Sequence, residues 1–169
     1  MEALQLRYIV DTSVWISLHK GNIIPQVLLL TNKGWDFLIT NFVALELQEP
    51  SSQTLIQQGV QLYPLSKTEV AAVEIMVGET PALTQADASL IVVAHTLNAT
   101  ILADDKVLRE KAGELRVKVH GTLWLLEQLV AAQLIDSDTL CDALEKMIAA
   151  KRRFPKQAVN RLRTRYNCP

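Results

Sequence analysis

The stretch Leu6-Arg-Tyr-Ile-Val-Asp11-Thr-Ser-Val-Trp-Ile16 decides the fold. Its first five residues are largely apolar and rich in β-formers, which predicts a strand over Leu6–Val10 that ends at Asp11. The apolar spacing that follows predicts a helix from Ser13 to Lys20, with Gly21-Asn22 as its C-cap. A strand that ends at a carboxylate and leads into a helix is typical of an open parallel α/β sheet.

Strands and helices alternate through the rest of the chain. Runs of β-branched residues predict strands, whereas 3.6-residue apolar spacing, capping residues and prolines predict helices. Further strands are expected at Asp36–Thr40, Val60–Tyr63, Thr100–Leu102 and Val117–His120. Helices are expected at Pro25–Leu30, Phe42–Gln48 (capped by Asn41), Gln53–Gln58, Lys67–Val77, Thr84–Leu97, Asp104–Ala112, Leu123–Ala132, Thr139–Ala150 (capped by Ser137 or Asp138) and Val159–Arg165. We therefore expect a parallel sheet of four to five strands between layers of helices.

Length and composition indicate one domain. The chain has 169 residues, of which 49% are hydrophobic and 21% charged, as is usual for a globular protein. No apolar run approaches the roughly 18–20 residues that span a bilayer, and Met1-Glu2-Ala3-Leu4 does not resemble a secretion signal. We expect a single domain over residues 1–169, with a core at 1–135 and a helical, basic C-terminal extension at 136–169, located in the cytoplasm. Cys141 and Cys168 have no zinc-binding spacing and are expected to be inert thiols.

The charge is unevenly distributed along the chain. The first 145 residues hold nine basic and 18 acidic side chains, a net charge of −9, whereas the last 24 carry +8. A basic tail on an acidic body favours two hypotheses: contact with RNA, or docking on an acidic face of this or a neighbouring subunit. The residues that we expect to contact RNA are Lys151, Arg152, Arg153, Arg161, Arg163 and Arg165.

Carboxylates occur where the predicted strands end. Asp11 follows the first strand directly, Asp104-Asp105 follows Thr100–Leu102, and Glu46 lies one turn into the helix after the second strand. Asp87 lies in the first turn of the Thr84 helix. Functional groups gather at the carboxyl ends of parallel strands, so we expect these acids to share one site.

Such a cluster needs a counter-charge. Neighbouring carboxylates repel one another and raise their own pKa values, and a divalent cation relieves that repulsion. Hard oxygen ligands suit Mg²⁺ or Mn²⁺ rather than zinc. Two such ions activate a water molecule and stabilise the leaving oxygen of a phosphodiester, so the pattern favours a nuclease.

Each acid also has a purely structural alternative. Carboxylates cap helices or lie in solvent, and the joint position of all four near one sheet edge is the argument against that interpretation. The alternatives are a capping box Thr84-x-x-Asp87, a helix cap at Asp104 or Asp105, a helix cap at Asp11 (or at Thr12 or Ser13), and a solvated helix residue at Glu46.

Four motifs resemble those of PIN domains. Tyr8-Ile-Val-Asp11-Thr-Ser-Val-Trp-Ile16 is similar to the family's opening strand, Asp and helix, and Thr40-Asn-Phe-Val-Ala-Leu-Glu46-Leu resembles its second motif. Leu83-Thr-Gln-Ala-Asp87-Ala-Ser-Leu-Ile-Val-Val-Ala94 is similar to the third, and Ile101-Leu-Ala-Asp104-Asp105-Lys-Val-Leu-Arg109 to the fourth. Gly121-Thr-Leu with the following apolar helix resembles a subgroup common among toxin–antitoxin genes.

The resemblance implies a PIN-like three-layer α/β/α fold and a Mg²⁺- or Mn²⁺-dependent ribonuclease, as in VapC-type toxins. It implies RNA as the substrate, a small antitoxin as a partner and a homodimer. Carried over residue by residue, Asp11, Glu46, Asp87 and Asp105 are the expected metal ligands and catalytic acids. The family often has Thr-x-Asp in the fourth motif, where this chain has Ala103, so by that register Asp105 is the matching acid and Asp104 an assisting neighbour.

Two other classes of protein compete with this interpretation. A PIN fold that has lost catalysis would act as a nucleic-acid or protein binding module, and the complete carboxylate set argues against it. A phospho-acceptor domain of the receiver or haloacid-dehalogenase kind needs a different acidic pattern, because Asp11-Thr-Ser13 lacks the second acid of Asp-x-Asp. The three histidines and three tryptophans are expected in packing, surface or interface positions.

Overall fold

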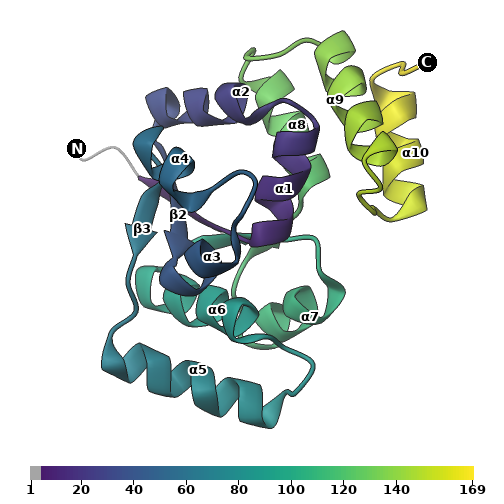
Figure 1. The fold of residues 1–169 in the computed structure, drawn as a ribbon. Helices are drawn as coiled ribbons and strands as arrows, with labels where there is room; N and C mark the ends of the chain where they lie inside the picture. The colour runs from purple at the N-terminus through teal and green to yellow at the C-terminus, as the bar shows by residue number, and fades with distance from the viewer. Residues whose placement is uncertain (1–4) are drawn as a thin grey trace.

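The computed structural model describes residues 5–169 and contains a five-stranded parallel sheet (Figure 1). The strands lie in the order β3-β2-β1-β4-β5, so β1 is central and pairs with β2 on one side and β4 on the other. Their bounds are β1 (Leu6–Val10), β2 (Trp35–Thr40), β3 (Gln61–Tyr63), β4 (Thr100–Leu102) and β5 (Val119–His120). All four strand pairings are parallel, so the carboxyl ends of the strands lie along one edge.

Helices cover both faces of the sheet (Figure 1). α6 and α7 lie on one face with α5 outside them, whereas α1, α2 and α8 lie on the other with α9 and α10 outside them. The bounds are α1 (Thr12–Lys20), α2 (Ile24–Leu28), the 3₁₀ turn η1 (Leu29–Lys33), α3 (Asn41–Glu46), α4 (Ser52–Gln57), α5 (Lys67–Glu79), α6 (Gln85–Leu97), α7 (Lys106–Glu114), α8 (Thr122–Ala131), α9 (Ser137–Ala149) and α10 (Lys156–Arg165). The predicted three-layer α/β/α fold is confirmed.

The helix caps correct two sequence predictions. Thr40, not Asn41, is the N-cap of α3, because its hydroxyl accepts the Val43 N–H at 3.1 Å. Asn41 instead accepts the backbone N–H of Leu65 through its side-chain oxygen. Asp136, rather than Ser137 or Asp138, caps α9 and accepts the backbone N–H of Thr139. Each true cap precedes the predicted one in the chain, which lengthens the helix at its start.

The expectation of two inert thiols is wrong. Cys141 in α9 and Cys168 beyond α10 form a disulfide, with 27 residues of separation and Cα atoms 5.4 Å apart. The C-terminal segment that follows the bend at Pro155 forms α10, which begins three residues before the predicted Val159. This helix returns the chain to α9, so two cysteines with no local spacing motif meet only in the folded protein.

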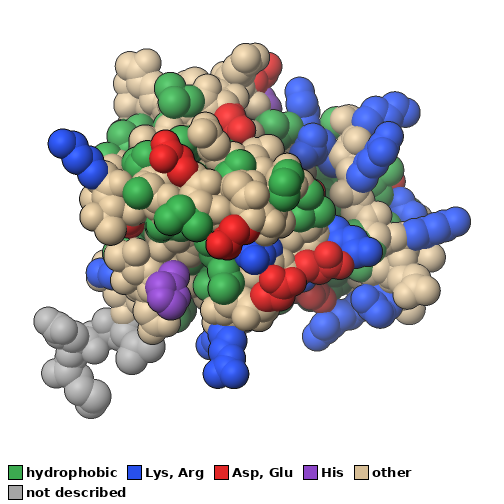
Figure 2. Space-filling view, turned by 90° about the horizontal axis from the view of Figure 1, so that it is seen from below, with side chains coloured by type: hydrophobic (Ala, Val, Ile, Leu, Met, Phe, Trp, Pro, Cys, Tyr) green, Lys and Arg blue, Asp and Glu red, His purple; other side chains and the backbone are tan. Residues whose placement is uncertain are grey.

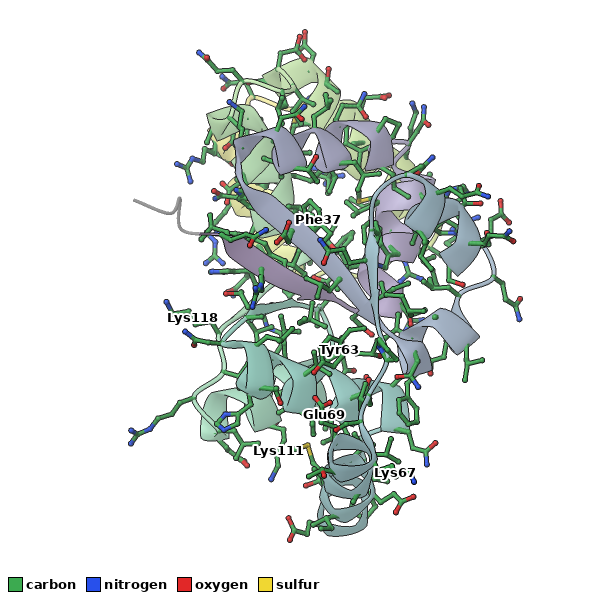
Figure 3. The ribbon with its side chains drawn as sticks, turned by 90° about the vertical axis from the view of Figure 1, so that its left-hand side faces the viewer. Phe37, Tyr63, Lys67, Glu69, Lys111 and Lys118 are labelled. Atoms are coloured by element: carbon green, nitrogen blue, oxygen red, sulfur yellow. A yellow bond between two sulfur atoms is a disulfide. The ribbon has the colours of Figure 1, made fainter. Side chains whose placement is uncertain are left out.

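One buried cluster joins the sheet to both helical layers. It runs from Tyr8 to Leu162 and includes Trp15 and Phe37 among its fully buried side chains. At its margin, Tyr63 at the end of β3 donates its hydroxyl hydrogen to Glu69 in α5 (Figure 3). No helix within residues 5–169 combines the length and apolar character needed to cross a membrane.

Candidate active site

Asp11 is a buried carboxylate at the centre of the sheet edge. It directly follows β1, and its backbone N–H donates to the carbonyl of Leu102 at the end of β4 at 2.9 Å. Its side chain is only 5% exposed and accepts a 2.6 Å hydrogen bond from the Ser13 hydroxyl. Asp11 occupies the N-cap position of α1, yet its side chain makes no capping hydrogen bond. Asp11 is therefore the N-cap by position, as the structural alternative predicted, but its carboxylate does not cap the helix.

The surroundings of Asp11 favour its protonated form. The pKa of this carboxyl is raised from 3.8 to about 6, mainly by burial; the nearby charges of Asp87 and Glu46 also raise it, and hydrogen bonds from Ser13 and Thr12 partly offset them. Three acids from different elements therefore repel one another here, and Asp11 forms no ion pair with a side chain of residues 5–169.

Glu46 faces the same edge from the end of α3. Its Oε2 accepts a 2.8 Å hydrogen bond from the hydroxyl of Thr12, the first residue of α1. The side chain is exposed, as the solvated alternative predicted, but this contact across 34 residues holds it beside Asp11. Thr12 and Ser13 thus bind one carboxylate each, through consecutive hydroxyls that follow Asp11 in the chain.

Asp87 does form the capping box that its spacing predicts. Its Oδ2 accepts the Thr84 N–H at 3.0 Å, and its own N–H donates to the Thr84 hydroxyl at 3.1 Å. Its Oδ1 has no hydrogen-bond partner among residues 5–169. Asp87 therefore caps α6 with one oxygen, and its other oxygen remains available beside Asp11. The carboxylate is partly buried.

A buried pair of hydroxyls fixes α6 against α3. Thr40 and Ser89 lie 2.7 Å apart at their oxygen atoms, and Ser89 donates to the carbonyl of Ala86 at 2.6 Å. Because the hydrogen of Ser89 is used in that way, Thr40 donates to Ser89 and accepts from Val43. This chain of hydrogen bonds connects the helix that carries Asp87 to the helix that carries Glu46.

Asp104 and Asp105 have different environments. Asp104 accepts two hydrogen bonds from Thr122 at the start of α8, one from the backbone N–H and one from the hydroxyl. Asp105 is exposed and caps α7 through Oδ1, which accepts the Leu108 N–H at 2.9 Å. Both carboxylates are engaged in helix caps, but Asp104 uses both of its oxygens and Asp105 uses one.

The donor set fits a hard divalent cation in its chemistry. The acids offer carboxylate oxygens without a thiol or an imidazole, which suits Mg²⁺ or Mn²⁺, and buried Asp11 forms no ion pair within the described part of the chain. Within residues 5–169 no group of three or more His, Cys, Asp or Glu side chains has an arrangement that could hold a metal ion. The charges of Glu46 and Asp87 are close enough to raise the pKa of Asp11, but the three acids are not arranged as a complete metal-binding site.

The basic tail divides into docked and exposed side chains. Arg152 donates to the Ser17 hydroxyl and the Ser13 carbonyl, which ties it to α1. Arg163 pairs with Glu145 at 2.6 Å, and Arg165 pairs with Glu127 at 3.0 Å. These contacts favour docking for three of the six residues expected to contact RNA. The other three, Lys151, Arg153 and Arg161, make no ion pair within the described chain.

Charges of both signs meet on one face. Figure 2 shows acidic side chains gathered beside Lys and Arg side chains on the face seen from below in Figure 1. An anion that approaches this face is repelled by the acidic side chains and attracted by the neighbouring Lys and Arg side chains.

Sequence reasoning missed the residues that position the acids. The signal for Thr12 and Ser13 was available, since two hydroxyls follow Asp11 directly, but they were considered only as helix caps. Thr40 and Ser89 are 49 residues apart, and neither has a local pattern that pairs it with the other. Thr122 binds an acid 18 residues earlier in the chain. Contacts of this length require the tertiary fold.

Comparisons with known proteins identify the family and the fold. A family model described as a PIN domain matches residues 7–167. A PilT N-terminus domain protein of the archaeon Sulfolobus solfataricus has 23% identity and a TM-score of 0.51, over 73% of this chain and 93% of that one. PAE2754 of Pyrobaculum aerophilum has 19% identity and a TM-score of 0.52, over 76% and 92%.

A third solved structure is VapBC2 of Rickettsia felis, bound to a DNA fragment from its promoter. It has 13% identity and a TM-score of 0.51, over 69% of this chain and 98% of that one. At these identities the likenesses show the fold alone. No curated protein matches the chain.

Proposed function

Because the chain belongs to the PIN-domain family, we propose that it is a metal-dependent endoribonuclease and the toxin half of a toxin–antitoxin pair. The observation that carries the proposal is the buried carboxylate of Asp11, which lies near Asp87 and Glu46 and forms no ion pair with residues 5–169. A purely structural acid at this depth would have a partner that stabilises its charge. An arrangement that raises the pKa of its central acid is typical of functional sites.

In the proposed reaction, Asp11, Glu46, Asp87 and the uncapped oxygen of Asp105 would hold Mg²⁺ or Mn²⁺. When bound, the ion supplies Lewis-acid stabilisation of the phosphoryl oxygens and a water molecule of lowered pKa. The residues of the chain orient the acids: Ser13 fixes the Asp11 carboxylate, and Thr12 fixes that of Glu46. Asp104 keeps α8 in place rather than binding the ion, because both of its oxygens are occupied by Thr122.

The decisive test is cleavage of end-labelled, structured RNA with Mn²⁺, with and without EDTA. We expect cleavage with Mn²⁺, loss of cleavage with EDTA, and loss in Asp11→Asn. The matched control is Asp138→Asn, which removes one exposed acid from the start of α9, distant in sequence from every proposed ligand. Equal activity in wild type and Asp11→Asn would identify a contaminating ribonuclease and contradict the proposal.

We also propose a small antitoxin as partner and a homodimer as assembly. The structural likeness to VapBC2, which was solved with DNA of its promoter, supports a toxin–antitoxin role. Leu45, adjacent to Glu46, is 84% exposed, and Ile75 in α5 is 63% exposed, so apolar side chains are available for a partner to bury. Co-expression with the product of the neighbouring gene, followed by measurement of complex mass, tests both assemblies.

A second candidate function is an inactive PIN fold that binds a nucleic acid or a protein. It is favoured by the absence, within residues 5–169, of three or more potential ligands arranged to hold a metal ion. The two functions differ in one measurement. An inactive module gives no Mn²⁺-dependent cleavage, and its thermal stability does not change when Mn²⁺ is added.

A further inference from the structure

A groove runs beside the carboxylate edge, between the start of α7, the start of α8 and the segment 154–161. It has a volume of about 620 Å³, and Asp104, Lys106, Arg109, Trp124, Phe154 and Arg161 are among its lining residues. A second hollow of about 390 Å³ shares Leu123, Trp124, Ala158 and Arg161 with it and continues along α8 and α10 to Arg165. Together they form an extended channel, a shape that suits an extended polymer chain better than a compact ligand.

The cations of the groove differ in how far they are already engaged. Lys106 pairs with Glu110 at 3.7 Å, and Arg109 donates to the carbonyl of Ala103 at 3.1 Å. Arg161 is exposed and makes no hydrogen bond or ion pair through its side chain with any described residue. It lies where the two hollows meet, so its guanidinium is the one able to bind an anion without breaking a contact of the protein.

The groove also has an aromatic wall. Trp124 stacks on His120 at 3.8 Å between ring centroids and on Trp35 at 5.9 Å, so its ring is held in place by the protein. Phe154 is partly exposed and forms no aromatic pair with another described ring. Phe154 is therefore the aromatic side chain that is left to contact a base.

We propose that this groove is a subsite for single-stranded RNA, in which Arg161 binds a backbone phosphate and Phe154 contacts an unstacked base. A cation beside an aromatic ring is the combination by which proteins bind single strands. The lining residue Asp104 directly precedes the proposed ligand Asp105 in the chain, so the groove begins beside that acid. The inference rests on the proposed function, because it describes where the RNA substrate of the proposed active site lies on the protein surface.

Binding is measured separately from cleavage. The probe is a fluorescein-labelled single-stranded oligoribonucleotide of about 12 nucleotides, in EDTA, and the readout is fluorescence anisotropy at several salt concentrations with the full chain. We expect Arg161→Ala to raise the Kd at least five-fold and to lower the log–log salt slope by about 0.7, the value for one lost phosphate contact of a single strand. Arg161→Lys retains the charge and should restore most of the slope.

The aromatic contact has its own signature. Phe154→Leu keeps an apolar side chain but removes the ring, so we expect a Kd about five-fold higher with an unchanged salt slope. Lys156→Ala is the matched control for Arg161→Ala. It removes one exposed positive charge from the same helix, α10, at a position outside the groove. Thermal melting of each variant verifies folding.

Three results would overturn the subsite. Equal weakening by Lys156→Ala and Arg161→Ala would mean diffuse attraction by the tail. Unchanged RNA binding in both Arg161→Ala and Phe154→Leu would show that the groove does not bind RNA. A duplex of the same sequence that binds as tightly as the single strand would contradict contact with an unstacked base. Any of these results is compatible with Mn²⁺-dependent cleavage by wild type, so the proposed function and the subsite fail separately.

Discussion

The carboxylate of Asp104 accepts both hydrogen bonds that Thr122 donates, from the backbone N–H at 2.9 Å and from the hydroxyl at 2.5 Å. Thr122 is fully buried and begins α8, whose N-cap is the side-chain-free Gly121. Asp104, which follows β4, therefore caps α8, which follows the adjacent strand β5. The neighbouring Asp105 caps its own helix with one oxygen and leaves the other available.

This difference predicts opposite effects of two neighbouring substitutions. Asp105→Asn keeps an oxygen for the Leu108 N–H but loses the charge, so cleavage should fall strongly and stability should change by less than about 0.5 kcal/mol. Asp104→Ala leaves the buried N–H and hydroxyl of Thr122 without a partner, which should lower the free energy of unfolding by about 2–3 kcal/mol. Urea denaturation and the Mn²⁺ cleavage assay measure both quantities. A larger loss of cleavage in Asp104→Asn than in Asp105→Asn would reverse the assignment.

Gly121 is predicted to be intolerant of a side chain. A Cβ atom there would lie 2.6 Å from Oδ1 of Asp104 and 3.1 Å from Nη1 of Arg109. Because that carboxylate is held by Thr122, it cannot retreat without loss of the cap. We expect Gly121→Ala to lower the free energy of unfolding by about 1–3 kcal/mol, as other overpacked sites do.

The matched control for Gly121→Ala is Gly113→Ala in α7. A Cβ at Gly113 meets nothing within 4 Å, so the helix should gain about 0.5–1 kcal/mol from the better helix former. Equal effects of the two substitutions in urea denaturation would contradict the predicted clash.

The raised pKa of Asp11 predicts a pH-dependent stability. The folded state binds this proton more tightly than the unfolded state, so the contribution of Asp11 to stability in EDTA is lost as pH rises from about 4 to about 6 and stays constant above that. A shift of about two units corresponds to about 3 kcal/mol at 1.36 kcal/mol per unit. Asp11→Asn lacks this loss, so it should be more stable than wild type at pH 7 by up to about 3 kcal/mol.

Urea denaturation at pH 4, 5.5 and 7 in EDTA tests this, with Asp138→Asn as the control. Asn retains an oxygen that accepts the Ser13 hydroxyl, so the comparison isolates the charge. Added Mn²⁺ should stabilise wild type and leave Asp11→Asn unchanged. The same pH profile in both proteins would show that Asp11 is not the group that titrates.

The disulfide between Cys141 and Cys168 should contribute to stability through the loop that it closes. For a separation of 27 residues, the loss of chain entropy in the unfolded state corresponds to about 3–4 kcal/mol. We expect Cys141→Ser combined with Cys168→Ser to lower the free energy of unfolding by about that amount. Dithiothreitol should destabilise wild type to a similar extent and leave the double variant unaffected; a reductant-insensitive wild type would contradict the bridge.

The sequence by itself determined the order of the elements and the positions of the acids along them. β1 and β4 have the predicted bounds, and Thr84 and Asp87 form the predicted capping box, because strand periodicity and caps depend on residues within a few positions of one another. The order of strands and acids also indicated the family that the comparison identifies. Structural features that depend on local interactions can therefore be predicted from the sequence.

Only the tertiary structure decided which acids are similar in environment and which are not. Asp104 and Asp105 are neighbours in the chain, yet Asp104 accepts hydrogen bonds from Thr122 and Asp105 is exposed to solvent. The pairing of Cys141 with Cys168 likewise has no local signature. Their environments are set by groups 18 and 27 residues away, and those groups come into contact only because burial of the core brings α8, α9 and α10 against the rest of the fold.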